Sequence, residues 1–352
     1  MKHLTVIIII FLVVAGCNTT KTEKPTVIEN NIPDTSDLTN NFYDNTEIYK
    51  LNIGEIYVDG EISNPGKVDM SRLPVRSVFV KETLLDSAGI ERFVGAYRYD
   101  GYSLFDILDR VVPDKKNAKE FNPVIDIFVE VSNARGEKVV FSWGEIYYPN
   151  TLHRILIAGS VSRIVPSRSK DLWPLPSETK IVAANDLITE RNLSSPVRIT
   201  VRSFPRSFIV ARGMSPLYTD SFSLFDGEQQ ISVLSPVSEP ESVTYNTIFY
   251  GRGRGIHTTL PFSGMLLKDM IKPFYPLTQH NLKAGLFCIT GKDGYRCAVS
   301  YSELFNRNDQ QEFLLVRTEK DEDGGLFRVF PAADFFSDRA VKSLSGIYFE
   351  LF

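Results

Sequence analysis

The sequence predicts a duplicated fold in which β-strands alternate with short helices. In Leu286–Leu304, apolar runs flank Gly291–Gly294, and Ser300 stands three residues before Glu303. The Asp-Gly pair inside that loop favours a tight turn, and Ser-x-x-Glu is typical of a capping box, so we expect a hairpin that leads into a short helix. The same pattern stands 158 positions earlier, at Phe128–Ile146. Two such stretches in register predict a duplication.

The repeat extends on both sides of the two hairpins. Upstream, Asp100–Leu108 resembles Ser263–Ile271, and an apolar helical pattern follows in both. Downstream, an apolar strand, the spacing Asp-x-x-x-x-Arg and a closing strand occur twice, with the charged pairs Asp186 and Arg191, and Asp334 and Arg339. We interpret each such Asp and Arg as a cap and a structural ion pair rather than as catalytic residues.

The N-terminus resembles that of a bacterial lipoprotein. Met1–His3 is positively charged, and Leu4–Ala15 is apolar but too short to span a bilayer comfortably. Val14-Ala15-Gly16-Cys17 resembles a lipobox, in which small residues admit the signal peptidase and Cys17 carries the lipid. The alternative is an ordinary cleaved signal with an incidental cysteine. We therefore expect a signal peptide over residues 1–16 and a membrane partner reached through lipidated Cys17, in the cell envelope outside the cytoplasm.

Composition divides the rest of the chain. Residues 17–45 are rich in Thr, Asn, Asp, Lys and Pro, which predicts a flexible tether. Copy one is expected over residues 46–203, a connecting segment over 204–236 and copy two over 237–352. The formal net charge of −4, with no basic stripe, argues against a nucleic-acid partner.

Two cysteines remain in the mature body. Cys288 and Cys297 lie on opposite sides of the Gly291–Gly294 loop. If that loop has four residues, they face each other across the hairpin and can form a disulfide in an oxidising compartment. The alternative is a pair of buried thiols on neighbouring strands, because cross-strand bridges need specific geometry.

The order of the motifs resembles a known family. A strand, Gly60, a second strand, Asn64-Pro65 and Leu73-Pro74 are followed by Tyr99–Leu108, the hairpin, Ser-x-x-Glu, Asp186 and a closing strand. This order is similar to the molybdopterin-binding domain of sulfite-oxidase-type oxidoreductases. The resemblance implies an α+β fold class: two molybdopterin-domain-like copies with mixed, largely β frameworks and short helices.

The chain departs from that family at the metal. Members that do chemistry hold molybdenum through a cysteine thiolate between an early strand and the Gly-containing helix start, and this soft ligand suits the metal. The corresponding intervals, Lys81–Tyr99 and Gly251–Phe262, contain no cysteine. We therefore assign no catalytic residue and no metal ligand, and we expect no cofactor, with molybdopterin as the alternative. His153, His257 and His280 lack zinc-site spacing, and nothing in the sequence brings Ser, His and Asp together as a triad.

Two segments are candidates for binding. Gly251–His257 offers glycine amides with Arg252, Arg254 and His257, a composition that suits an anion, although a solvated basic turn is the alternative. His153–Lys180 is rich in Arg, Trp and Pro, and forms either a lid or partner surface, or an ordered loop that packs Trp173 onto its own domain.

These observations leave two classes of function. The first is a membrane-anchored lipoprotein that has lost the metal and acts as a scaffold for an anionic small molecule or an envelope protein. The second is a molybdopterin-dependent oxidoreductase with an atypical cofactor site. The missing thiolate favours the first, and it leaves open whether the chain is an enzyme.

Overall fold

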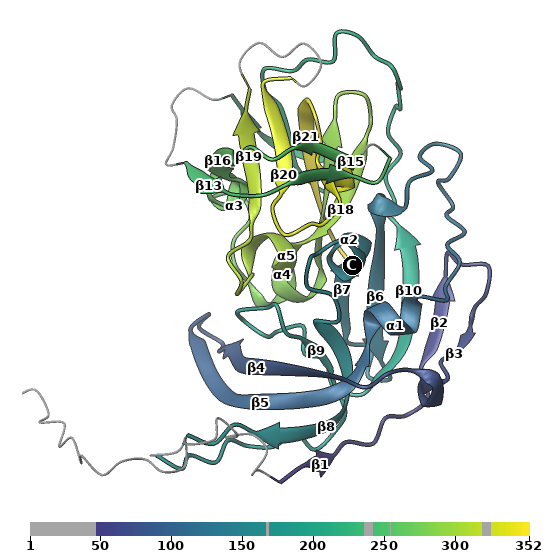
Figure 1. Ribbon diagram of the computed structural model, residues 1–352, viewed down its shortest axis with the longest axis vertical. Coiled ribbons are helices and arrows are strands. Elements are labelled where there is room, and N and C mark those ends of the chain that lie inside the picture. The colour runs from purple at the N-terminus through teal and green to yellow at the C-terminus, as the bar shows by residue number, and fades with distance from the viewer. Residues whose placement is uncertain (1–46, 167–168, 236–241, 254, 319–324) are drawn as a thin grey trace, which may run out of the picture.

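The fold is mostly β, and the expected α+β class is wrong. The computed structural model describes residues 47–166, 169–235, 242–253, 255–318 and 325–352. It contains 44% strand and 12% helix, and its small sheets are arranged like a four-bladed β-propeller (Figure 1). The physical reason is helix length: every α-helix has five or six residues, which is too short to cover a sheet, so the sheets pack on one another.

The first half, residues 47–203, holds two sheets. One, here called the framework sheet, has the order β3-β2-β10-β6-β7. Its strands are β2 (Tyr57–Gly60), β3 (Gly66–Lys67), β6 (Ile127–Asn133), β7 (Lys138–Ser142) and β10 (Pro196–Ser203). The other, the flanking sheet, has the order β1-β8-β5-β4, with β9 also on β8. Its strands are β1 (Tyr49–Lys50), β4 (Arg76–Leu85), β5 (Glu91–Ser103), β8 (Ile155–Arg163) and β9 (Ile181–Ala183).

The second half, from residue 222 on, repeats both sheets. Its framework sheet has the order β12-β11-β21-β17-β18, and its flanking sheet has the order β13-β16-β19-β20. The framework strands are β11 (Phe222–Asp226), β12 (Gln229–Leu234), β17 (Gly285–Gly291), β18 (Arg296–Ser300) and β21 (Leu344–Leu351). The flanking strands are β13 (Val243–Tyr245), β16 (Phe262–Leu266), β19 (Phe313–Arg317) and β20 (Phe327–Pro331). β11 and β12 fall inside the expected connecting segment, but they pair within the second half.

The strand directions repeat as well as the strand order. Each framework sheet contains one parallel pair, β2 with β10 in the first half and β11 with β21 in the second. Val58 lies beside Ile199 in one pair and Leu224 beside Ile347 in the other. In each sheet the second strand of that pair also pairs antiparallel with the predicted hairpin. Matching order, direction and register in both halves are what a sequence duplication produces.

Short helices follow the strands at matching places. They are α1 (Leu104–Leu108) and α2 (Trp143–Tyr147) in the first half, and α3 (Leu267–Ile271), α4 (Gln279–Ala284) and α5 (Tyr301–Phe305) in the second. Three single turns of 3-10 helix lie at η2 (Met70–Arg72), η3 (Val124–Asp126) and η4 (Ser337–Arg339). The hairpins that lead into α2 and α5 confirm the sequence prediction. No helix in the described residues is long and apolar enough to cross a membrane.

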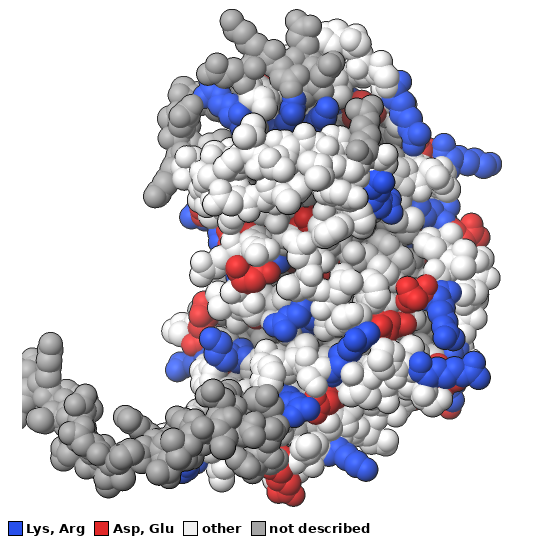
Figure 2. Space-filling model, viewed as in Figure 1, with Lys and Arg blue, Asp and Glu red and all other residues white. Residues whose placement is uncertain are grey.

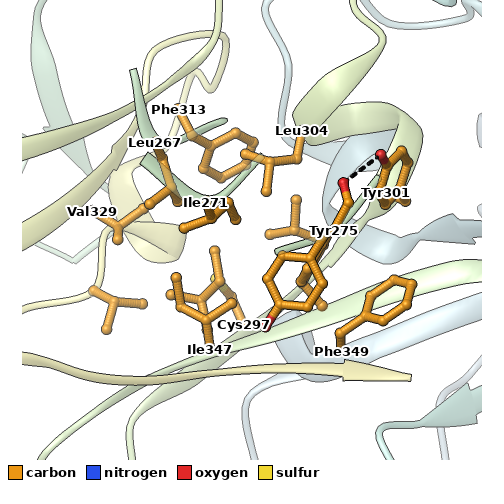
Figure 3. Packing of buried hydrophobic residues seen from close by; sticks show 14 of the residues in the cluster. Leu267, Ile271, Tyr275, Cys297, Tyr301, Leu304, Phe313, Val329, Ile347 and Phe349 are labelled. Atoms are coloured by element: carbon orange, nitrogen blue, oxygen red, sulfur yellow. Dashed lines mark hydrogen bonds between the residues drawn. The ribbon is translucent and has the colours of Figure 1, made fainter. Parts of the chain in front are cut away.

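Buried apolar residues form a cluster in each half, and a further cluster between the halves joins Phe128 and Val140 to Leu286 and Cys288. In the second half, α3 and α5 face strands of both sheets, and Figure 3 shows Ile271, Leu304 and Ile347 converging there. Tyr301 donates its hydroxyl hydrogen to the carbonyl oxygen of Tyr275 at 3.0 Å, so its polar end is satisfied. In the first half, the equivalent core lies between β6, β8 and α1. β6 turns Ile127, Val129 and Val131 into this core, whereas its opposite face carries Phe128, Glu130 and Ser132.

The halves differ in what is inserted between these strands. Between β13 and β16 the second half carries a hairpin, β14 (Phe249–Gly251) and β15 (Gly255–Thr258), which forms a sheet of its own. In the first half the corresponding strands, β4 and β5, are joined by a tight turn closed by the hydrogen bond from the Asp86 amide to the Ile90 carbonyl. The first half instead inserts a loop between β8 and β9.

Candidate functional site

The predicted Asp-Arg pair of the first half is a buried ion pair. The guanidinium of Arg191 donates to both carboxylate oxygens of Asp186, at 2.8 and 2.6 Å. It also donates to Glu145, at 2.9 and 3.0 Å, and to the hydroxyl of Ser300 in the second half, at 3.1 Å. Burial alone would lower the pKa of Arg191, but the two carboxylates raise it above its ordinary value. The structural interpretation of this pair is confirmed.

The second half repeats this cluster of an arginine, an aspartate and a glutamate, but here the serine hydroxyl of the opposite half donates to the glutamate. Arg339 donates to Asp334 at 2.8 and 2.6 Å and lies 2.7 Å from a carboxylate oxygen of Glu303. Ser142 of the first half donates its hydroxyl hydrogen to Glu303 at 2.7 Å. In the first half the capping box of Ser142 and Glu145 is complete, whereas the described contacts of the Glu303 carboxylate go to Arg339 and Ser142. Each arginine cluster therefore takes a hydroxyl from the opposite half.

Backbone groups tie the halves together in the same reciprocal way. Four hydrogen bonds of 2.7–3.0 Å cross the contact between the halves, here called the seam: Asn150 to Ala333, Asn308 to Asn185, Leu187 to Asn306, and Phe335 to Tyr148. The first two of these bonds join residues at matching positions of the two copies, and so do the last two. Such self-complementary contact is typical of a two-fold interface, and here it lies within one chain. These polar groups are thus committed to structure.

A Ser, His and Asp do meet in the first half, contrary to the sequence analysis. His153, which has a positive φ of 64°, places its Nδ1 atom 3.0 Å from the Ser103 hydroxyl and 3.4 Å from Asp106. A catalytic triad divides its serine and carboxylate between the two ring nitrogens, but here both approach Nδ1. Ser103 is also fully buried and caps α1. The cluster is a helix start and not a nucleophilic site.

The predicted anion loop forms a hairpin in which Arg252 is already paired with a carboxylate. The Nε of Arg252 donates to Asp338 at 3.1 Å, and its guanidinium lies 5.8 Å from the ring centre of Tyr148. The ring of His257 packs 5.2 Å from that of Phe249. Arg254 lies outside the described residues, as do Cys17, the signal peptide and the tether. The structure therefore joins Arg252 to an acid of its own chain.

The cysteine alternatives are settled in favour of free thiols. In the hairpin, Cys288 pairs with Ala298 and Ile289 pairs with Cys297, so the two cysteines are one position out of register. They face opposite sides of the sheet, each in a different core cluster, and both are free and fully buried.

The described thiols do not fit a molybdenum site. Burial raises the pKa of Cys297 to about 12 and that of Cys288 well above its ordinary value, and these raised pKa values disfavour the thiolate that a soft metal needs.

The segment His153–Lys180, rich in Arg, Trp and Pro, is an ordered loop in the residues described. Trp173 donates to the carbonyl oxygen of Ile164 at 2.9 Å and packs on the flanking sheet.

The candidate binding site is a cleft at the seam that the sequence did not reveal. It measures about 640 Å³ and lies between the loop after α1, the end of β10, the segment that leaves the first half, and Phe352 of the second half. Ligand pockets commonly measure about 300–1,000 Å³. Its charged lining comprises Lys116, Lys119, Arg202, Arg206, Glu61 and Glu120.

The two lysines of this seam cleft have no ion-pair partner among the described residues, whereas its two acids are engaged. Among the described residues, no carboxylate lies within 4.0 Å of the ammonium of Lys116 or Lys119, and both side chains are exposed. Glu61 instead accepts from the Lys116 amide at 2.9 Å and from the Ser203 hydroxyl at 2.6 Å. Glu120 is bound to the buried Arg296 at 2.9 Å. The cleft therefore presents positive charge on a chain whose formal net charge is negative.

The remaining two arginines are partly committed. Arg206 lies 3.1 Å from Glu228 and 3.3 Å from Glu350, while its buried Nε atom has no partner among the described residues. Arg202 lies 3.6 Å from Glu130. The lysines come from one loop, whereas Arg202 lies on β10 and Arg206 just after it, 86 positions beyond Lys116 and 87 beyond Lys119 respectively. Only the fold brings them together, so the one available signal was their close spacing within each segment.

Comparison with known proteins adds no assignment. No protein-family model matches the chain, and no curated protein matches it.

Proposed function

We propose that this protein is a lipid-anchored binding protein of the bacterial cell envelope, and that its seam cleft holds an anionic ligand. The observation that carries the proposal is the pair of exposed lysines, without ion-pair partners among the described residues, in the wall of that cleft. A concave site with positive walls concentrates field lines and raises the local concentration of anions.

The lining favours binding over catalysis. It contains neither histidine nor cysteine, and the hydroxyl of Ser203 already donates to Glu61. Thr200, a second hydroxyl in the lining, donates to Asp59 at 2.8 Å. Both carboxylates have further partners, because Glu61 also accepts from the Lys116 amide and Asp59 also accepts from Arg198, so these contacts support a structural role for the hydroxyls.

The location rests on the N-terminal sequence. The apolar run Leu4–Ala15 and the lipobox that ends in Cys17 support a lipidated N-terminus. Mass spectrometry of the native N-terminal peptide is expected to show acyl chains on Cys17, and Cys17→Ser is expected to lose these chains and to bind membranes more weakly than the wild type. Unchanged membrane partitioning of that variant would contradict the anchor and leave the cleft unaffected.

The cleft is tested by reversing its free charges. In Lys116→Glu combined with Lys119→Glu, affinity for inorganic phosphate, citrate or a sulfated oligosaccharide is expected to fall on the order of tenfold to a hundredfold, because charge-assisted bonds become repulsive. The wild-type affinity is expected to weaken as salt is raised. Isothermal titration calorimetry measures both effects.

A matched control keeps the charge change and moves it away from the cleft. Lys81→Glu combined with Lys342→Glu alters two exposed lysines elsewhere and is expected to bind like the wild type. Equal loss in both double variants would reduce the effect to net charge. Absence of saturable binding by the wild type to all three probes would reject an anion site.

A further inference from the structure

The hairpin β14–β15 presents an apolar outer surface. Ile248 and Ile256 are 54% and 63% exposed, and Phe335 beside them is 52% exposed. With Tyr250 these residues border an open cleft of about 500 Å³, and they are here called the hairpin patch. Figure 2 shows a broad band without charged side chains across the upper part of the molecule, where Figure 1 places β15. An uncharged surface with clustered aliphatic and aromatic side chains is typical of an interaction site.

The hairpin is held firmly from beneath, so its exposed face is part of an ordered structure. Phe249 packs against Phe262 and Phe330, with ring centres 5.5 and 5.8 Å apart. At its tip, Arg252 is bound to Asp338. A free two-stranded hairpin is marginal in water, and these contacts supply what it lacks. The packing leaves Ile256, paired with Tyr250 across the hairpin, on the outside.

The patch is an addition to the duplicated framework. The first half joins the corresponding strands with a tight turn, so it has no counterpart of the inserted hairpin β14–β15. The core of the second half does not need the outer face of the hairpin, because its buried cluster is built from other strands and helices. The exposed side chains are therefore unexplained by folding.

We propose that the hairpin patch rests on the lipid bilayer to which the chain is anchored, an inference that depends on the proposed lipid anchor. Aliphatic residues flanked by tyrosine suit the boundary between acyl chains and headgroups. The 29 positions between Cys17 and Glu47 span at most about 95 Å, whereas a body of this size has a radius of gyration of about 19 Å. The link is therefore long enough to let this face meet the membrane.

The four side chains of the hairpin patch are uncharged, which distinguishes it from the seam cleft, and Asp334, which also lines the adjoining cleft, is paired with Arg339. Insertion of apolar side chains depends on buried area and is insensitive to salt, whereas anion binding at Lys116 and Lys119 weakens as salt rises. A bilayer without net charge is therefore the appropriate probe. The unlipidated chain of residues 18–352, which keeps every residue the structure describes, is expected to sediment with phosphatidylcholine vesicles at both low and high salt.

Two kinds of variant test the contact. In Ile248→Asp combined with Ile256→Asp, vesicle partitioning is expected to fall by at least about tenfold, because two carboxylates would enter the interface. Leu172→Asp combined with Ile209→Asp makes the same change at residues that are 72% and 91% exposed elsewhere, and is expected to bind like the wild type. Ile256→Trp provides a direct reporter: its emission is expected to shift to shorter wavelength on vesicles and to be quenched by brominated lipid.

Three outcomes would overturn the proposal. They are failure of residues 18–352 to bind neutral vesicles, equal binding by the two aspartate double variants, and tryptophan emission from the Ile256→Trp variant that vesicles leave unchanged. Crosslinking of the hairpin to an envelope protein without vesicle binding would replace the bilayer with a protein partner. Vesicle binding by residues 18–352, together with native protein that mass spectrometry shows to carry no lipid on Cys17, would support the patch and reject only the anchor.

Discussion

The two halves agree where they are buried and differ where they are exposed. Both build a framework sheet, a flanking sheet and an arginine cluster from the same strand order. The first half uses its inserted loop to cover its own flanking sheet with Trp173, whereas the second half inserts a hairpin that leaves Ile248 and Ile256 outside. Contacts across the seam restrict the shared framework, and the insertions are free to acquire separate roles.

The largest expected effect comes from removing either buried arginine. Arg339→Ala leaves Glu303 and Asp334 without their cation, which costs about 3–5 kcal/mol of unfolding free energy. Arg191→Ala is expected to cost less within this range, because Glu145 retains slight exposure whereas Glu303 has none. Urea denaturation of both variants measures the difference.

An exposed ion pair provides the control for those variants. Arg198 is 58% exposed beside Asp59, so Arg198→Ala is expected to cost less than about 1 kcal/mol. A loss of similar size at Arg198 and Arg339 would show that the buried clusters carry no special weight. A smaller cost for Arg339→Ala than for Arg191→Ala would reverse the ranking of the halves.

A smaller effect is expected at Gly144, where the halves differ by one side chain. A Cβ atom there would lie 2.3–2.5 Å from the guanidinium and Cδ of Arg339, so Gly144→Ala is expected to destabilise by about 1–3 kcal/mol despite the better helix propensity of alanine. The matching residue of the second half, Ser302, donates to the Leu282 carbonyl oxygen at 2.9 Å, and Ser302→Ala is expected to cost about 1 kcal/mol. Thermal unfolding compares the two, and a neutral Gly144→Ala would show that Arg339 has room to move.

The smallest effect concerns pH and the loop before β8. Burial lowers the pKa of His153, opposed by Asp106 and reinforced by Arg76, so the unfolded chain takes up a proton at this residue before the folded one does. The contribution of His153 to stability is therefore lost as pH falls through the ordinary histidine pKa. The asparagine side chain in His153→Asn does not titrate and tolerates a positive φ, and the second half likewise places a non-glycine residue, Gln310, at a φ of 57° in its corresponding loop.

The comparison for His153 is the stability difference between wild type and His153→Asn. Chemical denaturation is expected to show that the unfolding free energy of the wild type falls relative to that of the variant as the buffer is changed from neutral to mildly acidic. A difference that is the same at both pH values would mean that this histidine is not linked to folding.

Local features of the fold were predictable because their causes are local. Ser142 with Glu145, the two hairpins and the Asp-x-x-x-x-Arg spacing are each set by residues a few positions apart, and each formed as expected. The fold class was taken from the family resemblance and was wrong, because the class depends on how the sheets pack, and the helices here are only five or six residues long. Residue spacing carries no information about whether four sheets meet around a common centre.

The binding site was less predictable still. The Gly251–His257 loop drew attention through its composition, but the fold placed Asp338, 86 positions away, against Arg252. Lys116 and Arg202 line the same seam cleft because β10 returns to the framework sheet of the first half. No short sequence motif predicts that return. The grouping of these lysines and arginines in one cleft follows from the strand order and not from a local sequence pattern.

The position of β21 in its sheet sets the order in which the protein matures. It lies between β11 and β17, yet it follows both of them along the chain, and its partner residues Ser223 and Gly346 are 123 positions apart. Until β21 arrives, β11–β12 and β17–β18 are separate hairpins with open edges, which are hazards for aggregation. The first half, closed by β10 in the same way, completes its sheet earlier. Each half therefore passes through a stage with open strand edges before its own closing strand completes the framework sheet.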